Sequence, residues 1–226
     1  LPHEYNCTPF MILITALNLL LHRRTGQTDI RIATLSANRG PDGTEDLIGY
    51  LVNALVLRTR LRADMSHVDL LTAVREVCLE AYAHQDVPFE HLESLLHSGG
   101  EERRRPLYQV MLNYRNFSSP AEQAGGLTIA SWSGKNRAAD PGIGISRLDV
   151  NIHLHEVSTK LTGAVNYKTD LFDQRAIAEF VASYIHILAD MTERSGRQFS
   201  RLGPIIGRCL ILRVLFTLLL ASSSMA

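Results

Sequence analysis

The sequence has no excess of charge of either sign and contains little cysteine. Lys and Arg together number 23, as do Asp and Glu, so the 226-residue chain carries no formal net charge at neutral pH. This balance provides no electrostatic attraction to nucleic acid, and no nucleic-acid partner is expected. Cys7, Cys78 and Cys209 are odd in number and far apart. That pattern excludes a disulfide framework and is typical of a reducing compartment, so we expect a cytoplasmic protein.

Long apolar runs are missing as well. The apolar stretch at residues 207–221 is interrupted by Arg213 and falls short of the ~20 apolar residues that a membrane-spanning helix needs. No membrane partner is therefore expected. We interpret residues 204–226 as an atypical tail, either a helix that covers an apolar patch or a segment foreign to the fold, with a membrane anchor as the weaker alternative. Because a helix signal begins almost at the first residue, we expect the chain to be a truncation or part of a longer protein.

Familiar catalytic and metal-binding motifs do not occur in the chain. Ser131, Ser133 and Ser146 lack the Gly-x-Ser-x-Gly setting of a serine nucleophile. His153 and His155 should share one face of a strand. No second His or Cys pair has the spacing of zinc ligands. A polar strand face is therefore the preferred interpretation of the two histidines, and no metal site is expected.

Helical and strand patterns follow one another along the chain. Thr8 and Pro9 are suited to begin a helix that ends at Gly26, and Ser66 and Asp173 are suited to cap later helices. The apolar periodicity predicts helices over 9–25, 66–85, 88–96 and 174–193, and strands over 29–40, 106–117, 126–133, 148–157 and 160–170. Residues 47–61 form a further β-rich stretch, which is interrupted near Gly49 and Asn53.

Residues 84–90, His-Gln-Asp-Val-Pro-Phe-Glu, allow two interpretations. Pro88 disfavours helical geometry at Val87, so one helix should end there and a short one should begin. Asp86 could accept N–H bonds at the new start, and Phe89 should be buried together with Leu92 and Leu95 or Leu96. A structural corner is therefore favoured over a catalytic cluster. The motif residues are His84, Gln85, Asp86, Pro88, Phe89 and Glu90.

Several segments together resemble one family, the condensation domains of nonribosomal peptide synthetases. Residues 48–61, IGYLVNALVLRTRL, are similar to the family motif Ile-Gly-x-Phe-Val-Asn-Thr-x-x-x-Arg, and residues 84–90 match His-Gln-Asp-x-Pro-Phe-Glu almost letter for letter. Residues 104–116 resemble a third motif, and the flanking segments follow in the family's order. The departures are mild: Ala54 stands for Thr, and Gly100 for an Arg.

The resemblance implies an α/β fold of two layers, a mixed β-sheet covered by helices, that forms one half of a chloramphenicol acetyltransferase-like domain. Residues 1–203 would be the C-terminal subdomain, with residues 204–226 as the tail. The family's catalytic His-His-x-x-x-Asp-Gly lies upstream of this region, and no two of the nine histidines here are adjacent. No catalytic residue is therefore expected in this chain, which should be inactive alone.

The resemblance also implies a function. The whole domain would join a carrier-bound donor thioester to an acceptor amine in secondary metabolite biosynthesis, with substrates on phosphopantetheine arms and no cofactor bound directly. The expected partners are carrier proteins, the missing N-terminal half and an adjacent adenylation domain. The alternatives are a non-catalytic module that binds carrier proteins or other partners, and half of another acyltransferase of this fold.

Four residues would face the substrate tunnel between the two halves. Gly49 would allow close backbone approach, and Tyr50 and Asn53 would line the tunnel. Asn53 could instead satisfy a backbone group at a bulge. Arg39 could cross to the missing motif's Asp, or could equally be a loop arginine bound by Asp42 or Glu45. Because a half-domain lacks its partner, the apolar residues of 48–57 should form an exposed patch.

Overall fold

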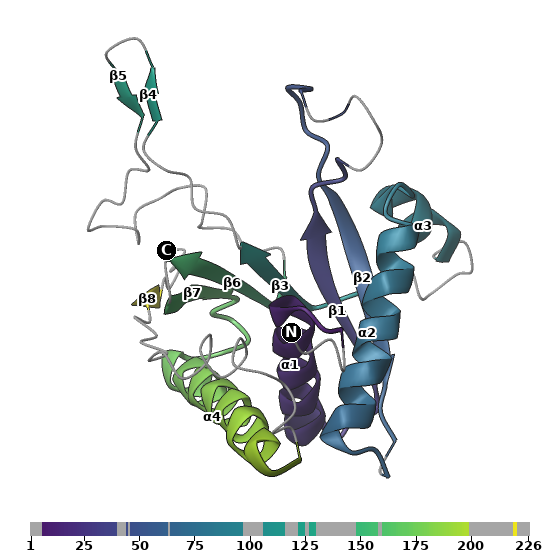
Figure 1. Cartoon of the computed structure of the whole chain (residues 1–226), viewed down its shortest axis with the longest axis vertical. Helices are drawn as coiled ribbons and strands as arrows, with labels where there is room; N and C mark the ends of the chain where they lie inside the picture. The colour runs from purple at the N-terminus through teal and green to yellow at the C-terminus, as the bar shows by residue number, and fades with distance from the viewer. Residues whose placement is uncertain are drawn as a thin grey trace. The chain divides into compact units, whose positions relative to one another are not determined.

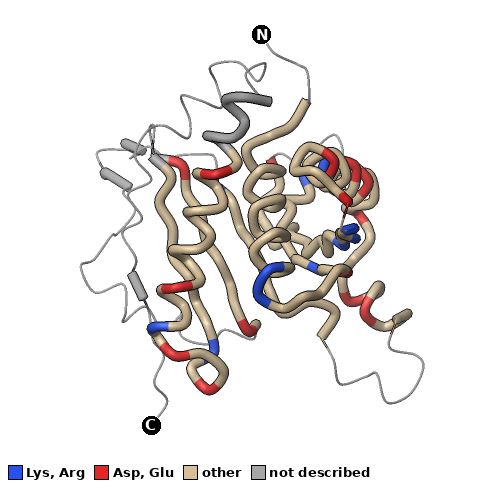
Figure 2. The backbone as a smooth tube through the Cα atoms, turned by 90° about the horizontal axis from the view of Figure 1, so that it is seen from below, with Lys and Arg blue, Asp and Glu red and all other residues tan. Residues whose placement is uncertain are grey.

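The computed structural model describes four helices and eight strands (Figure 1). The described residues are 6–39, 44, 46–62, 64–96, 106–115, 122–124, 127–129, 148–157, 160–198 and 219–220. They fall into two compact units, one within His3–Met111 and the other within Leu112–Ala226. Both acidic and basic positions occur along the described backbone (Figure 2). Within the described residues, no helix is long and apolar enough to cross a membrane.

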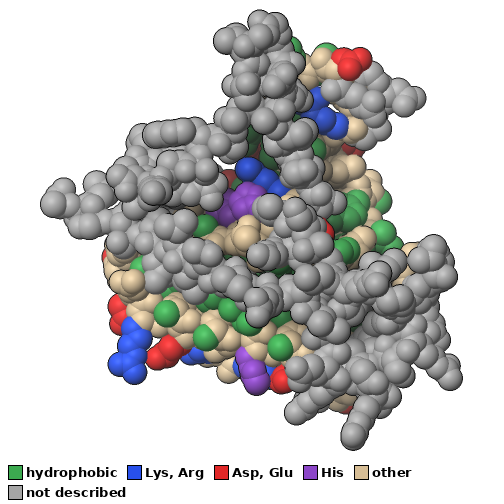
Figure 3. Space-filling model, turned by 60° about the vertical axis from the view of Figure 1, so that its left-hand side comes forward, with side chains coloured by type: hydrophobic (Ala, Val, Ile, Leu, Met, Phe, Trp, Pro, Cys, Tyr) green, Lys and Arg blue, Asp and Glu red, His purple; other side chains and the backbone are tan. Residues whose placement is uncertain are grey.

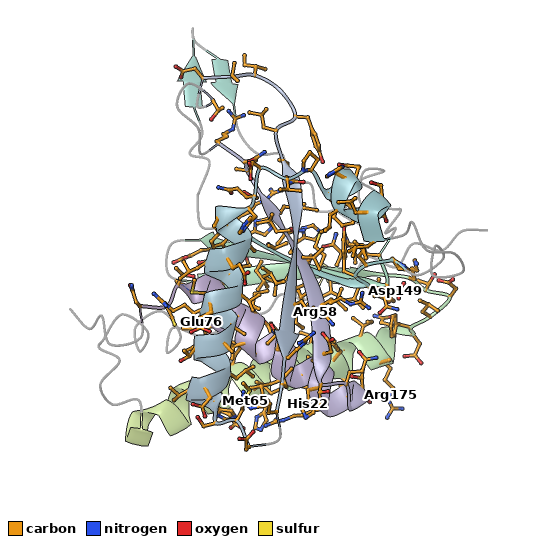
Figure 4. All side chains as sticks on the ribbon, turned by 90° about the vertical axis from the view of Figure 1, so that its right-hand side faces the viewer. His22, Arg58, Met65, Glu76, Asp149 and Arg175 are labelled. Atoms are coloured by element: carbon orange, nitrogen blue, oxygen red, sulfur yellow. The ribbon has the colours of Figure 1, made fainter. Side chains whose placement is uncertain are left out.

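The N-terminal unit is built on a mixed sheet. Strands β1 (Asp29–Ser36) and β2 (Asn53–Arg60) pair antiparallel over their whole length, and β3 (Val110–Arg115) begins parallel to β1. At one end of the β1–β2 pair, Arg58, labelled in Figure 4, donates from Nε to Oδ1 of Asp29 over 2.8 Å. The other end of the pair, at Ser36 and Asn53, holds the candidate site described below.

Two long helices complete the N-terminal core, and both begin where local signals predict. In α1 (Pro9–Thr25), the Thr8 side chain caps the start, while Gly26 ends the helix with a left-handed φ of 71° that glycine tolerates. The helix is apolar on all sides and largely buried, and it contacts α2 (His67–Ala83) and β1. Ser66 caps α2 together with Asp69.

In the C-terminal unit, the strands lie in the order β3-β6-β7-β8. Strands β6 (Val150–Val157) and β7 (Lys160–Tyr167) form an antiparallel hairpin. Helix α4 (Gln174–Gln198) begins after Asp173, whose carboxylate accepts the N–H of Ala176 over 2.6 Å, as the cap prediction required. The buried side of α4 includes Ile177, Val181, Tyr184, Leu188 and Met191.

The C-terminal unit also contains two shorter strand pairings. Short strands β4 (Glu122–Ala124) and β5 (Leu127–Ile129) pair with each other. Of the apolar tail, only β8 (Leu219–Leu220) is described, and it pairs parallel with β7. The remaining tail residues, like Ser131, Ser133 and Ser146, lie outside the described part of the chain.

Candidate functional site

The motif at residues 84–90 forms a tight turn between two helices. Helix α2 ends at His84, whose ring Nδ1 lies 2.9 Å from the carbonyl oxygen of Glu80. Helix α3 (Phe89–Leu96) begins five residues later. The carbonyl of Pro88 accepts from the backbone N–H of His91 at 3.0 Å and of Leu92 at 3.3 Å, so Pro88 lies at the start of the short helix, as predicted. Asp86 and Glu90 are exposed, and the described residues contain no cluster of metal-binding side chains.

Asn53 holds this turn with three hydrogen bonds. Its Nδ2 donates to the carbonyl oxygens of Gln85 at 2.9 Å and Val87 at 2.7 Å, and its Oδ1 accepts the N–H of Phe89 at 3.1 Å. Both donor hydrogens and the acceptor oxygen of the amide are therefore engaged. Asn53 therefore satisfies backbone groups, as the alternative prediction required, but these groups belong to a distant turn, so the predicted bulge is wrong.

The start of α3 therefore differs from the prediction. The first N–H groups of a helix lack partners within the helix, and a side-chain oxygen from the preceding residues commonly satisfies them. Asp86 was expected to do so, but Asn53 caps Phe89 from strand β2. A local pattern could not reveal this contact, because the two residues are separated by 36 positions.

A second contact holds the same turn to the end of β1. The hydroxyl of Ser36 donates to Oε1 of Gln85 over 2.6 Å, and the N–H of Asn38 donates to the Ser36 hydroxyl over 3.1 Å. Ser36 and Asn53 are paired residues of β1 and β2. The sheet end therefore holds the turn from two adjacent strands. We call this arrangement of Ser36, Asn53 and residues 84–89 the clamped corner.

Phe89 is less buried than predicted. It is half-buried and contacts Tyr108 edge to face, with ring centroids 5.4 Å apart. The expected stripe on α3 is incomplete, because Leu95 and Leu96 are exposed and no residue of the helix is fully buried. Since α3 contacts only a small part of the described sheet, its apolar side has little to pack against. Partial burial raises the pKa of Tyr108, with Glu93, Glu90 and Tyr50 adding smaller effects.

The segment before Asn53 projects apolar side chains into solvent. Ile48 is fully exposed and Tyr50 is 89% exposed, while Leu47 and Val52 are also exposed. The predicted patch is therefore present from residue 47 to 52, but it does not reach residue 57, because Leu55 and Leu57 are buried in β2. The strand itself begins at Asn53, one of the two positions near which an interruption of the β-rich stretch was predicted.

Gly49 and Arg39 are two of the predicted tunnel residues. No described atom lies within 4 Å of a Cβ built on Gly49, so the close backbone approach expected there in the tunnel stays a prediction. Arg39 donates from Nη1 to the carbonyl oxygens of Thr44 at 2.8 Å and Leu47 at 2.9 Å. Its side chain thereby connects residue 39 with Thr44 and with Leu47, the first residue of the apolar segment. Asp42 and Glu45, its predicted partners, lie outside the described residues.

The alternation predicted for His153 and His155 is observed in the C-terminal unit. Val150, Ile152 and Leu154 are buried, whereas the two histidines are half-buried on the other face of β6. Burial lowers the pKa of His153, and the neighbouring charges of Arg115 and His155 lower it further.

Comparison with known proteins defines the family. The condensation domain family model matches residues 1–203. A linear gramicidin synthase protein of Brevibacillus parabrevis is 37% identical over 191 residues, covering 84% of this chain and 4% of the synthase protein. Malpibaldin synthetase of Mortierella alpina is 32% identical over 181 residues, covering 80% of this chain and 3% of that synthetase.

A solved structure shows the same fold. The X-domain from teicoplanin biosynthesis superposes with a TM-score of 0.70 and 27% identity, covering 84% of this chain and 43% of that chain. Its complex with OxyB superposes with a TM-score of 0.63 and 25% identity, over 84% of this chain and 41% of that chain. The fold is thus the α/β, chloramphenicol acetyltransferase-like class, with a mixed sheet and covering helices.

This chain belongs to the condensation domain family of nonribosomal peptide synthetases, the enzymes of secondary metabolite biosynthesis. It spans less than half of the X-domain chain and only a few per cent of the gramicidin and malpibaldin enzymes.

Proposed function

We propose that the chain is the C-terminal half of a condensation domain and that it acts in amide-bond formation when joined to its N-terminal half. The observation that carries this proposal is the clamped corner. Through Asn53, it joins the two most specific family motifs, residues 48–61 and 84–90, in one hydrogen-bonded unit. The apolar segment 47–52 begins at that corner and is exposed, as a surface that completes a tunnel would be.

In this proposal the acceptor amine attacks the carbonyl carbon of the donor thioester. A C–N bond forms, the C–S bond breaks, and the proton lost by the amine ends on the released thiol. The family's histidine motif, which either takes this proton or positions the amine, is absent from this sequence, which has no adjacent histidines. The contribution of this half is positional, because holding two tethered reactants together supplies much of such a rate enhancement.

The partners follow from the same proposal. Carrier proteins would present both substrates on phosphopantetheine arms, so this half would bind no cofactor of its own. An N-terminal condensation half and an adenylation domain would complete the synthetase module, in the cytoplasm. Tyr50 is the residue of segment 47–52 that we assign to the tunnel wall, since it is exposed and adjoins the clamped corner.

The test is to combine the chain with the upstream half encoded before it and to measure amide product from two loaded carrier proteins by mass spectrometry. We expect no product from the chain alone and turnover from the completed domain. Tyr50→Ala in the completed domain should lower turnover by ~10-fold or more, because small displacements of a tethered substrate are costly. Leu171→Ala, at another exposed apolar side chain, is the matched control. Turnover by the chain alone would contradict the proposal.

A second candidate is a partner-binding module without chemistry. It is favoured by the likeness to the X-domain, which has been solved in complex with OxyB. The same completed domain distinguishes the two candidates. A domain that folds and binds a partner protein but forms no amide from any loaded carrier pair would support the second candidate.

A further inference from the structure

The connection between β1 and β2 has both of its ends bound to one residue of the clamped corner, Gln85. The Ser36 hydroxyl donates to side-chain Oε1 of Gln85 over 2.6 Å, and Asn53 Nδ2 donates to the backbone carbonyl oxygen of Gln85 over 2.9 Å. Ser36 is the last residue of β1 and Asn53 is the first residue of β2. Figure 1 shows the connection extending past the ends of both strands. Gln85 therefore fixes the base of the connection from both sides.

Arg39 supplies a second set of hydrogen bonds inside the connection. The N–H of Asn38 donates to the Ser36 hydroxyl over 3.1 Å, and Asn38 has a left-handed φ of 50°, which asparagine tolerates. The next residue, Arg39, donates from Nη1 to two backbone carbonyl oxygens, and one of these is the carbonyl oxygen of Leu47, at 2.9 Å. One arginine nitrogen thus links the start of the connection to the first residue of segment 47–52.

Segment 47–52 has little packing of its own to hold it in place. Ile48 is fully exposed, Tyr50 is 89% exposed, and no described atom lies within 4 Å of a Cβ built on Gly49. Hydrophobic side chains also reach the surface on the face turned to the viewer in Figure 3, so exposure by itself assigns no role to the segment. Ordering a backbone costs conformational entropy, which burial normally offsets. Here the described contacts that can offset this cost are the hydrogen bonds at the two ends of the segment.

We propose that Arg39 and Gln85 are positioning residues for the condensation reaction, because their hydrogen bonds hold segment 47–52, and with it Tyr50, in place on the tunnel wall. Neither residue needs to touch a substrate, since both act through the backbone that carries Tyr50. This inference rests on the proposed function, which assigns Tyr50 to the tunnel wall.

The atoms that form these hydrogen bonds predict which replacements preserve the role. Both bonds of Arg39 leave from a single nitrogen, and the ammonium nitrogen of a lysine also carries several donor hydrogens. Arg39→Lys should therefore keep the link that Arg39→Ala removes. In the same way, Gln85→Glu keeps an oxygen that accepts the Ser36 hydroxyl, whereas Gln85→Leu does not.

The first experiment measures how fast chymotrypsin cleaves the full chain after Tyr50, followed by mass spectrometry. A protease cuts an exposed segment when the segment can leave its folded conformation, so the loss of a hydrogen bond that holds it should raise the rate. We expect cleavage ~5-fold faster or more in Arg39→Ala and Gln85→Leu, the factor for one lost hydrogen bond, and near the wild-type rate in Arg39→Lys and Gln85→Glu. Arg62→Ala is the matched control, because Arg62 is an exposed arginine that pairs with Asp64.

Thermal unfolding of each variant separates local release of the segment from loss of folding. Arg39 is exposed, so the melting temperature of Arg39→Ala should stay close to that of the wild-type chain. Because the full chain is tested without the upstream half, an effect of Arg39→Ala cannot arise from a contact with that half. Unchanged cleavage in folded Arg39→Ala would overturn the proposal, and Gln85→Leu gives the same test if Arg39→Ala does not fold.

The second experiment measures turnover in the completed domain. We expect Arg39→Ala to lower turnover by ~10-fold, because a small displacement of a tethered substrate is costly, and Arg39→Lys to restore most of it. In a Tyr50→Ala domain, Arg39→Ala should have little further effect, because both changes act through the same side chain. A loss of folded protein would instead multiply the two effects. Multiplicative effects of Arg39→Ala and Tyr50→Ala would therefore overturn the positioning role.

Failure of this inference differs from failure of the proposed function. If the completed wild-type domain forms amide but Arg39→Ala and Gln85→Leu change neither chymotrypsin cleavage nor turnover, the inference fails and the function stands. If the completed wild-type domain forms no amide from any loaded carrier pair, the function fails, and faster cleavage of the variants would then mark Arg39 and Gln85 as structural residues only.

Discussion

At the scale of single residues, Asn53 connects two motifs that are separate in the sequence, residues 48–61 and residues 84–90. It is the first residue of β2, and its side chain reaches the backbone of the turn after α2 and the first N–H of α3. An amide is the side chain that suits this position, because it offers two donors and one acceptor in one plane. A carboxylate could cap Phe89 but could not donate to the carbonyl oxygens of Gln85 and Val87.

We predict that Asn53→Ala destabilises the chain by about 1–3 kcal/mol, since it removes a helix cap and leaves two carbonyl groups without their donor. Asn53→Asp should show a loss at least as large, because the contact with Phe89 N survives but the carboxylate oxygen that replaces Nδ2 faces the carbonyl oxygens of Gln85 and Val87. Urea unfolding monitored by circular dichroism measures both variants. Equal stability of Asn53→Ala and the wild-type chain would show that the clamp is not structural.

At the scale of elements, helix α3 is held by few contacts, and none of its residues is fully buried. It is held at its N-terminus by Asn53 and along one side by the contact of Phe89 with Tyr108, whereas Leu95 and Leu96 remain exposed. A helix with so little burial depends on a few contacts for its position. It should therefore be among the first elements to open in native-state hydrogen exchange.

The element-scale prediction concerns the aromatic pair. Phe89→Ala should cost about 1–3 kcal/mol, less than the ~3–5 kcal/mol of a fully buried phenylalanine, because the side chain is half-buried. A double-mutant cycle with Tyr108→Ala should give a coupling of about 0.5–1.5 kcal/mol for the edge-to-face contact. A coupling near zero would show that the two rings are neighbours without mutual stabilisation.

At the scale of the whole molecule, the exposed segment 47–52 is the feature that a complete domain would be expected to cover. Its apolar side chains are Leu47, Ile48, Tyr50 and Val52. A run of such side chains on a soluble surface favours association with another protein surface. In the proposed function that surface belongs to the N-terminal half.

We predict that the chain alone binds a hydrophobic dye at neutral pH, or associates, and that the separately produced upstream half suppresses the dye signal. The double variant Ile48→Ser/Tyr50→Ser should lower dye fluorescence without loss of stability, since both side chains are exposed. A chain that ends at Pro204 is the control for the apolar tail. Monomeric, dye-silent behaviour of both lengths would indicate a self-sufficient domain and contradict the half-domain proposal.

Much of the secondary structure could be predicted from the sequence, because it depends on interactions between residues that are close together in the chain. The caps at Thr8, Ser66 and Asp173 and the stop at Gly26 act on groups three or four residues away, so a short stretch of sequence contains all that they need. The alternation along β6 is equally local, because successive side chains of a strand point to opposite faces. The resemblance to the family was also found in the sequence alone, because short motifs follow one another along the chain in the family's order.

Tertiary structure alone decided which group each polar side chain would meet. Asn53 rather than Asp86 caps α3, Ser36 reaches Gln85 across 49 positions, and Asn113 is left with a buried oxygen that no described residue satisfies. These outcomes depend on how strands and helices distant in sequence pack together. The burial of Phe89 was overestimated for the same reason: apolar periodicity predicts which side of a helix is apolar, but only packing determines whether anything covers it.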